Sequence, residues 1–289
     1  MNLITGTSGH FGKTAAEQYL QKNPNHKLAI LSRSAEKVKH LTDKGAELRI
    51  GDYGDYPSLV KAFQGIEKVL FVSSNDLTNR EAHHKNVINA AKEAGVQQLV
   101  FTSFQYQSTT ADSPNGLMPV YVATEKFLKE SGVNYTILRN GIYTDLLPDI
   151  IGPVIRNNKT LFAPAGDTQV AFTSRNDLAE AAATILSSND FQNTTLDLTN
   201  ATTVNFPEIA ALLSSILKME ITYVAPSETD YKQALNTMGL PEEVIGLFAG
   251  IIASIKAGEF SKTTSQLEKI LGRSPESVEN FLKKASTIF

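Results

Sequence analysis

Three glycines near the start of the chain have the spacing of a phosphate-binding loop. Gly6, Gly9 and Gly12 form a G-x-x-G-x-x-G run that follows a short apolar segment and opens an expected helix. In such a loop the first glycine permits a tight turn, the second lets the backbone approach a pyrophosphate, and the third lets the helix pack closely on a sheet. The free N–H groups at the start of the helix attract the phosphates. The run therefore predicts a dinucleotide-binding site; the alternative is a structural turn that merely needs glycines.

The residues after the second expected strand indicate which dinucleotide binds. A site for NAD usually places Asp or Glu there, to bind the ribose 2′-hydroxyl. This chain has Leu31, Ser32, Arg33 and Ser34 instead, with no acid. Arg33 can bind a 2′-phosphate, aided by the hydroxyls of Ser32 and Ser34. The sequence therefore predicts a preference for NADP(H); the alternative is that Arg33 is a solvated surface charge.

The segments around these motifs alternate between expected strands and expected helices. Strand-like apolar runs occupy residues 3–5, 27–31, 46–50, 68–73, 98–102 and 134–138. Helix-like segments occupy residues 14–21, 34–44, 57–64, 80–94 and 121–131. Runs such as 69–72 show no polar alternation, which is typical of strands buried on both faces. This order predicts an α/β fold with a doubly wound parallel sheet.

The second half of the chain is more helical and less regular. Five apolar residues repeat there at helical spacing and predict one buried helix face: Ile209, Leu212, Leu213, Ile216 and Leu217. Because no Pro/Ser/Gly-rich linker separates the halves, a second unit is expected to dock directly on the first. We expect residues 1–142 to form the dinucleotide-binding domain, with segments at about 170–200 returning to it. Residues 143–289 are expected to form mainly a smaller, largely helical substrate-binding domain.

Composition and charge narrow the classes of function. The 289 residues carry 27 Lys and Arg against 30 Asp and Glu, so the chain lacks the basic excess that nucleic-acid binding requires. The absence of cysteine excludes disulfides, thiolate nucleophiles and Cys-ligated zinc. His83 and His84 are neighbours on an expected helix and diverge by about 100°, so we expect no metal site. The longest apolar run, residues 244–255, is shorter than the roughly 20 residues of a membrane span, and no leader pattern opens the chain, so we expect a cytoplasmic protein without membrane partners.

Several further motifs carry a family resemblance. They are residues 51–53 (GDY), 86–92 (NVINAAK), 124–126 (TEK), 135–143 (YTILRNGIY), 164–167 (PAGD) and 261–263 (SKT). Together with the glycine loop and Arg33 they resemble the NmrA-like branch of the atypical short-chain dehydrogenase/reductases. Within that branch the chain is most similar to the bacterial NAD(P)H:quinone oxidoreductases and the triphenylmethane dye reductases. The resemblance covers essentially the whole chain.

The resemblance implies a Rossmann-like domain that binds NADPH and a smaller domain that closes a cleft over the nicotinamide. It assigns the pyrophosphate to Gly6, Thr7, Ser8, Gly9, His10 and Phe11. It assigns the 2′-phosphate to Arg33 and the surroundings of the adenine to Asp52. The ribose and nicotinamide side would be lined by Ser73, Ser74, Asn75, Thr102 and Ser103. The nicotinamide and the substrate would face Asn140, Gly141, Ile142 and Tyr143.

A missing dyad restricts the reaction. Ordinary short-chain dehydrogenases use Tyr-x-x-x-Lys, and none of the nine tyrosines here has Lys four residues on. Tyr121 and Lys126, the nearest pair, are about 140° apart around a helix and cannot share a face. This argues against alcohol oxidation and sugar epimerisation, which need a phenolate base. Hydride transfer to quinones or cationic dyes stays compatible, because weak donors can stabilise the product oxyanion and water can protonate it.

Three side chains are then candidate catalytic donors: Lys126, Asn140 and Tyr143. The alternatives are a surface or ribose contact for Lys126, and core hydrogen bonding for Asn140 and Tyr143. We expect an NADPH-dependent reductase that transfers hydride to a quinone-like or planar conjugated small molecule. The alternatives are a non-catalytic NADP(H)-sensing regulator, and a sugar epimerase or other dehydrogenase. The sequence leaves the electron acceptor and the oligomeric state open, a homo-oligomer included.

Overall fold

The computed structural model describes residues 1–107 and 118–289, and its centre is a seven-stranded sheet in the order β3-β2-β1-β4-β5-β6-β8. Every neighbouring pair runs parallel. The strands are β1 (Asn2–Ile4), β2 (Leu28–Ser32), β3 (Glu47–Ile50), β4 (Lys68–Phe71), β5 (Gln98–Phe104), β6 (Asn134–Asn140) and β8 (Thr194–Leu198). The chain winds outwards from β1 in both directions, which confirms the predicted doubly wound sheet.

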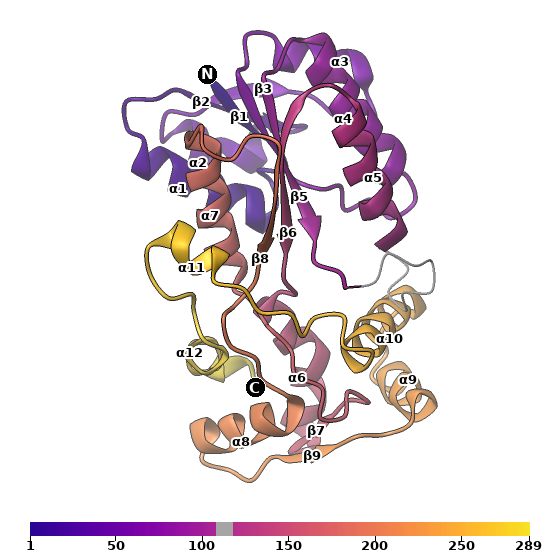
Figure 1. The fold of residues 1–289 in the computed structure, drawn as a ribbon. Helices are drawn as coiled ribbons and strands as arrows, with labels where there is room; N and C mark the ends of the chain where they lie inside the picture. Colours follow the sequence, from indigo (N-terminus) through magenta and orange to yellow (C-terminus); the bar gives the residue numbers. More distant parts are fainter. Residues whose placement is uncertain (108–117) are drawn as a thin grey trace.

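Helices cover both faces of this sheet (Figure 1). One face carries α1 (His10–Lys22), α2 (Lys39–Thr42), α7 (Arg175–Ser187) and α11 (Gln266–Leu271). The other carries α3 (Tyr56–Phe63), α4 (Arg80–Glu93) and α5 (Met118–Glu130). In β4, Leu70 packs under the first group, whereas Val69 and Phe71 pack under the second. This is the burial on both faces that the unbroken apolar runs predict.

Local sequence explains where several helices begin. Asp55 caps α3, since its carboxylate accepts the N–H of Ser58 at 3.3 Å. The helix expected over residues 34–44 is shorter than predicted: a 3₁₀ turn (Glu36–Val38) is followed by the single turn of α2. The backbone of Val38, with φ −119° and ψ 11°, departs from helical values and interrupts the helix there.

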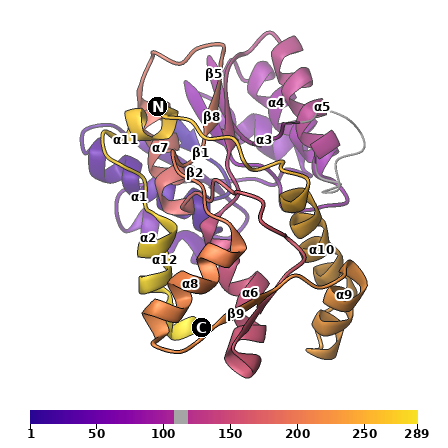
Figure 2. The ribbon, with the colours of Figure 1, turned by 60° about the horizontal axis from the view of Figure 1, so that its bottom comes forward.

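The rest of the chain forms a second body with its own apolar core (Figure 2). Its elements are a 3₁₀ turn (Thr144–Leu146), α6 (Leu147–Asn158), β7 (Thr160–Phe162), α8 (Phe206–Leu217), β9 (Thr222–Val224), α9 (Glu228–Thr237), α10 (Glu242–Lys256), α12 (Val278–Lys284) and a last 3₁₀ turn (Ser286–Ile288). Its core includes Ile142, Phe172, Phe206 and Tyr231. β7 and β9 pair in parallel as a small separate sheet, which the sequence analysis did not predict.

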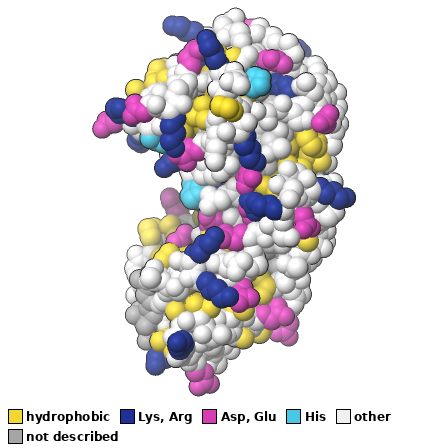
Figure 3. Space-filling model, turned by 90° about the vertical axis from the view of Figure 1, so that its left-hand side faces the viewer, with side chains coloured by type: hydrophobic (Ala, Val, Ile, Leu, Met, Phe, Trp, Pro, Cys, Tyr) yellow, Lys and Arg dark blue, Asp and Glu magenta, His cyan; other side chains and the backbone are white. Residues whose placement is uncertain are grey.

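The carboxyl ends of the central strands point towards this second body (Figure 1). β5, β6 and β8 end level with one another, because Asn140 is in register with both Phe104 and Leu198. The returning C-terminal segment crosses the same edge, where Lys262 O accepts a hydrogen bond from Gln105 Nε2 at 3.2 Å. Figure 3 shows the surface hollowed between the upper and lower bodies, with side chains of both charges around the hollow. Open parallel sheets bind ligands at this edge.

Across the described ranges, 1–107 and 118–289, no helix is both long and apolar enough to span a bilayer.

Candidate active site

The glycine loop joins β1 to α1, and its three glycines have different surroundings. Gly6 has a φ of +65°, and a Cβ there would lie 2.9 Å from Cβ of Val72. A Cβ on Gly12 would lie 2.7 Å from the carbonyl oxygen of Thr5 and 2.6 Å from the carbonyl carbon of Gly6. A Cβ on Gly9 would meet only the Gly6 oxygen, at 3.4 Å. The fold itself therefore needs Gly6 and Gly12, whereas the space beside Gly9 is left for a ligand.

The start of α1 suits an anion. The helix begins at His10, and no side chain caps its first N–H groups. Ser8, Gly9 and His10 are exposed, whereas Thr7 is buried and donates its hydroxyl to Leu31 O at 3.0 Å. The Thr7 side chain therefore anchors the loop to β2. With free N–H groups, an open Gly9 and a close helix–sheet contact at Gly12, these residues fit the diphosphate of a dinucleotide.

Arg33 and Asp52 lie side by side at the ends of β2 and β3. Arg33 Nη1 is 3.4 Å from Asp52 Oδ2, and their side chains are 75% and 40% exposed. Ser32 does not reach towards Arg33, because its Oγ closes a local turn with the N–H and carbonyl of Ser34. The exposed guanidinium is available to a phosphate, with Asp52 as its partner in this structure.

The ends of β4 and β5 hold the next group of predicted residues. The N–H of Ser73 donates to Thr102 Oγ1 at 2.9 Å, and Ser73 Oγ lies 3.4 Å from the hydroxyl of Tyr121. Ser74 follows in the same loop and contacts α4, and Asn75 is exposed. Thr102 is thus a support for Ser73, buried beneath the loop.

Ser103 faces a buried ion pair instead. Its Oγ donates to Glu125 Oε1 at 2.7 Å, and Glu125 is 2% exposed. Arg139 binds the same carboxylate through Nε at 2.9 Å and Nη2 at 2.5 Å. The hydroxyl of Tyr106 completes the group, donating to Glu125 Oε2 at 3.1 Å. Hydrogen bonding and charge from Glu125 raise the pKa of Arg139, so this group ties β5, β6 and α5 together as a permanent ion pair.

Asn140 ends β6 with a fully buried side chain. Neither its Oδ1 nor its Nδ2 makes a hydrogen bond of regular geometry to any part of the chain that the structure describes, but the amide interacts with the Tyr143 side chain. Buried amides in folded proteins nearly always have a hydrogen-bond partner, and Tyr143 is the one that Asn140 approaches. Next to it, Gly141 must be glycine, since a Cβ would lie 2.7 Å from Thr173 Oγ1. Ile142 turns into the core of the second body.

Tyr143 is partly exposed and packs against a cation. The guanidinium carbon of Arg175 lies 4.9 Å from the centre of its ring. Burial, and then the neighbouring Tyr121 hydroxyl, raise the pKa of Tyr143 to about 12, although Arg175 and the nearby Asn140 amide oppose the rise. Tyr143 is therefore a neutral phenol at physiological pH and can donate a hydrogen bond.

Lys126 is not brought to this group. Its side chain is 72% exposed and pairs with Glu130 at 2.7 Å on the solvent side of α5. Tyr121 occupies the buried side of the same helix and stacks on Phe104, with ring centres 6.1 Å apart. In the sequence Tyr121 stands out only as half of a possible dyad with Lys126, and its role as a separate hydrogen-bond donor is visible only in the structure. Its place in the helix after β5 was the available signal.

Arg80 is a second residue that the sequence analysis missed. It is 7% exposed, and its guanidinium carbon lies 5.6 Å from the centre of the Tyr121 ring. A cation over the face of an aromatic ring is a favourable contact. Within the described residues, no group of three or more His, Asp or Glu side chains is arranged to hold a metal ion.

The doubly wound sheet, the glycine loop and the free start of α1 define a dinucleotide-binding protein. Residues 6–189 match the model of a family described as NAD(P)H-binding. The chain belongs to this NAD(P)H-binding family, and it is an NmrA-like, NAD(P)H-dependent oxidoreductase whose cofactor is NADP(H).

Relatives of known structure and name agree with this membership. Quinone oxidoreductase 2 of Escherichia coli (strain K12) is 33% identical over 272 residues, which cover 94% of both chains. The crystal structure of an NADPH-dependent quinone oxidoreductase from Escherichia coli, in complex with NADPH, has a TM-score of 0.93 at 31% identity and covers 99% of this chain and 100% of that one. The triphenylmethane reductase of Citrobacter sp. has a TM-score of 0.91 at 32% identity, and covers 99% of both chains.

Proposed function

We propose that this oxidoreductase transfers hydride from NADPH to a quinone-like or other planar conjugated acceptor. The observation that carries the proposal is the pair of Asn140 and Tyr143, whose amide and phenol interact at the sheet edge where ligands bind. A neutral phenol beside an amide suits a flat ligand whose carbonyl oxygen can accept a hydrogen bond. The similarity to quinone oxidoreductase 2 and to triphenylmethane reductase supports this class of acceptor.

The roles of the protein are binding and orientation. NADPH, when bound, supplies the hydride. The glycine loop and the start of α1 bind the diphosphate, and Arg33 binds the 2′-phosphate. Asn140 positions the Tyr143 side chain, and Tyr143 donates a hydrogen bond to the acceptor oxygen.

The overall reaction needs no protein base. One quinone takes a hydride, with its two electrons, from NADPH and one proton from water, and it becomes a hydroquinone while NADPH becomes NADP⁺. The charge that develops on the acceptor oxygen is stabilised by hydrogen-bond donors placed in advance. Tyr143, a neutral phenol, and Tyr121, 3.4 Å from Ser73 Oγ, are the nearby hydroxyls. This fits a chain without cysteine and without Tyr-x-x-x-Lys.

The substitution Asn140→Leu tests the central residue. Because the amide makes no hydrogen bond of regular geometry to the described residues, an apolar side chain of similar size should leave the free energy of unfolding unchanged or raise it. Loss of the group that positions Tyr143 should lower kcat with a simple quinone by about 100-fold. Asn236→Leu, at an exposed position on α9, is the matched control and should not alter kcat.

The assay follows NADPH absorbance after protein and quinone are mixed. Oxidation well above the uncatalysed rate in the parent protein, lost in Asn140→Leu and kept in Asn236→Leu, supports the proposal. NADPH binding without oxidation of NADPH by any quinone or dye would refute it and favour a regulator. A parent-like kcat in Asn140→Leu would mean that the active site does not include Asn140.

A further inference from the structure

Two adjacent histidines of α4 contact the same residue of the loop after β4. The backbone N–H of Ser74 donates to Nε2 of His84 at 3.0 Å, and Ser74 Oγ lies 3.1 Å from Nδ1 of His83. The rings diverge, as the sequence indicated, yet they meet one residue because His84 binds its main chain and His83 its side chain. None of the roles described above uses either histidine.

Side chains determine the shape of this loop. β4 ends at Phe71, and the N–H groups that follow have no strand partner to bind. Ser73 donates to Thr102 Oγ1 at 2.9 Å, Ser74 donates to His84, and Asp76 donates to Ser74 Oγ at 3.2 Å. Backbone N–H groups bound by side chains have a position that those side chains set. His84 is the deepest of these anchors, at 1% exposed.

We propose that His84 is a positioning residue for the NADPH site. By accepting the N–H of Ser74 it fixes residues 73–75, to which the family resemblance assigns the ribose and nicotinamide side of NADPH, and the inference rests on the proposed function and on that assignment. His84 touches neither cofactor nor acceptor. Its effect is on the affinity for NADP(H), through a loop that is already in its binding shape before the cofactor arrives.

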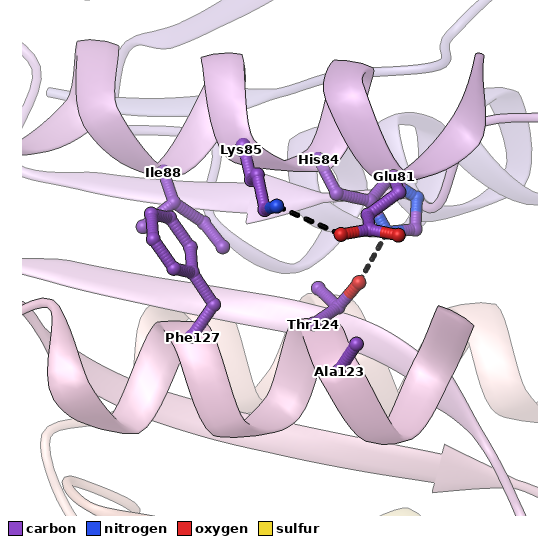
Figure 4. Close-up of a pocket in the computed structure, with 7 residues that line it drawn as sticks. All are labelled: Glu81, His84, Lys85, Ile88, Ala123, Thr124 and Phe127. Atoms are coloured by element: carbon purple, nitrogen blue, oxygen red, sulfur yellow. Dashed lines mark hydrogen bonds and ion pairs between the residues drawn. The ribbon is translucent and has the colours of Figure 1, made fainter. Parts of the chain in front are cut away.

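The hydrogen bonds around His84 run in one direction. Since the N–H of Ser74 can only donate, Nε2 must accept, and the proton of the neutral ring is on Nδ1. Nδ1 donates to Thr124 Oγ1 at 2.8 Å, and the Thr124 hydroxyl donates to Val120 O at 2.7 Å. Figure 4 shows the His84 side chain of α4 pointing at Thr124 of α5. The loop after β4 is thereby tied to α5 through one ring whose tautomer is determined.

The surroundings keep this ring neutral. Phe71 and Phe101 pack edge-on against it, with ring centres 5.1 and 5.4 Å away. The charged and titratable groups that face it are Arg80 and His83 on α4 and Tyr121 on α5. Glu81 and Lys85 line a small cavity beside the ring, between α4 and α5. Burial, and after it electrostatic repulsion from Arg80 and the neighbouring His83, lower the pKa of His84 to about 3. Nε2 therefore remains an acceptor throughout the physiological range.

The small cavity beside His84 is not a second ligand-binding site that could explain a role for this residue. It lies between α4 and α5 and has a volume of about 10 Å³, which is close to the minimum for a single water molecule (Figure 4). A substrate cannot enter it. The ring acts on the site through Ser74, and a direct contact with a ligand on the α4–α5 side is excluded by size.

The experiment measures the Kd for NADPH without any acceptor. His84→Phe keeps an aromatic ring, which is somewhat larger, and removes both nitrogens, so the Kd should rise about tenfold. His84→Gln places an amide oxygen where Nε2 was and should restore the Kd to within about threefold of the parent. Thr124→Val leaves the ring in place without its Nδ1 partner and should give an intermediate Kd. His26→Gln, on an exposed turn, is the control and should leave the Kd unchanged.

A purely structural role predicts other results. If His84 only fills space, His84→Phe melts at a lower or equal temperature and binds NADPH with the parent Kd, which overturns the proposal. If His84→Phe does not fold, an unchanged Kd in Thr124→Val together with a tenfold loss in His84→Gln overturns it instead. In steady state, the proposal expects a higher KM for NADPH with kcat within about twofold. A parent protein that binds NADPH and reduces no acceptor defeats the proposed function and leaves the test of His84 intact.

Discussion

The guanidinium of Arg33 lies 3.4 Å from the carboxylate of Asp52, across the ends of β2 and β3. An acid at the end of the second strand would favour the 2′-hydroxyl of NAD, but here the acid follows the third strand and faces a cation. Because both side chains are well exposed, the pair itself contributes little to stability. Arg33 can exchange Asp52 for a 2′-phosphate, or bind both, without unfolding its surroundings.

Arg33→Ala should therefore separate the two nicotinamide cofactors. Removing a charge-assisted contact to the 2′-phosphate should raise the KM for NADPH at least tenfold, whereas the KM for NADH should change by less than about twofold. The KM values of both cofactors with one acceptor are the measurement. Lys39→Ala removes another exposed, paired cation and is the control. Equal changes for NADPH and NADH would contradict the assignment.

Alanine substitutions at two glycines of the glycine loop between β1 and α1 should have different effects. Gly12→Ala forces a Cβ to within 2.7 Å of backbone, so the free energy of unfolding should fall by about 3 kcal/mol. Gly9→Ala meets only one protein atom at 3.4 Å, so the fold should tolerate it while the Kd for NADPH rises at least tenfold. Urea unfolding and cofactor titration measure the two effects.

Gly246→Ala is the control for these substitutions. A Cβ there meets nothing within 4 Å, and the residue lies inside α10, where alanine is the better helix former. The free energy of unfolding should rise by up to about 1 kcal/mol, with no change in the Kd for NADPH. A Gly9→Ala protein that binds NADPH normally would place the diphosphate elsewhere.

Much of the dinucleotide-binding half could be predicted from the sequence. The spacing of the glycines, the unbroken apolar strands and Arg33 are local features, and each has one dominant physical explanation. Gly6 and Gly12 are where a turn and a close approach require them. The short strands β7 and β9 could not be found this way, because three residues show no periodicity and their pairing brings Leu161 beside Tyr223, 62 positions along the chain (223 − 161).

The chemistry of the site depends on contacts that the sequence does not contain. Asn140 could be named as a candidate, but its burial and its interaction with Tyr143 emerge only when β6 is packed between β5 and β8. Nothing in the sequence indicated that His83 and His84 bind the loop after β4, because adjacent histidines are usually assessed only as possible metal ligands. Ser103 is predicted to lie at the cofactor, and the sequence did not show that its side chain is on the α5 side of β5, where it donates to Glu125.

Breaking the buried ion pair should be costly. Glu125→Ala leaves Arg139 without its carboxylate in a largely buried setting, so the free energy of unfolding should fall by about 3 kcal/mol. Glu130→Ala is the matched control on the same helix, because Glu130 and its partner Lys126 are 60% and 72% exposed. Thermal melts of both variants provide the comparison. Similar small shifts in the two variants would mean that Arg139 is not confined as the structure indicates.

His84 should make the fold sensitive to acid. Its pKa is lowered from 6.5 to about 3, so between these values the unfolded chain binds a proton that the folded chain does not. The contribution of His84 is therefore complete above about pH 6.5 and is lost as the pH falls towards 3, at up to about 1.4 kcal/mol per pH unit. Urea midpoints of the parent and His84→Gln at pH 7, 6 and 5 should converge or cross as acid is added. Parallel curves would show that the ring is protonated in the folded state.

Hydride transfer itself is the central claim, and isotope substitution tests it most directly. NADPH that carries deuterium at the transferred position is mixed with the protein and a simple quinone in single turnover, and the loss of NADPH absorbance is timed. We expect the deuterated cofactor to be oxidised more slowly than ordinary NADPH, with one hydroquinone formed for each NADPH consumed. Tight binding of NADPH with no oxidation above the uncatalysed rate would contradict the account.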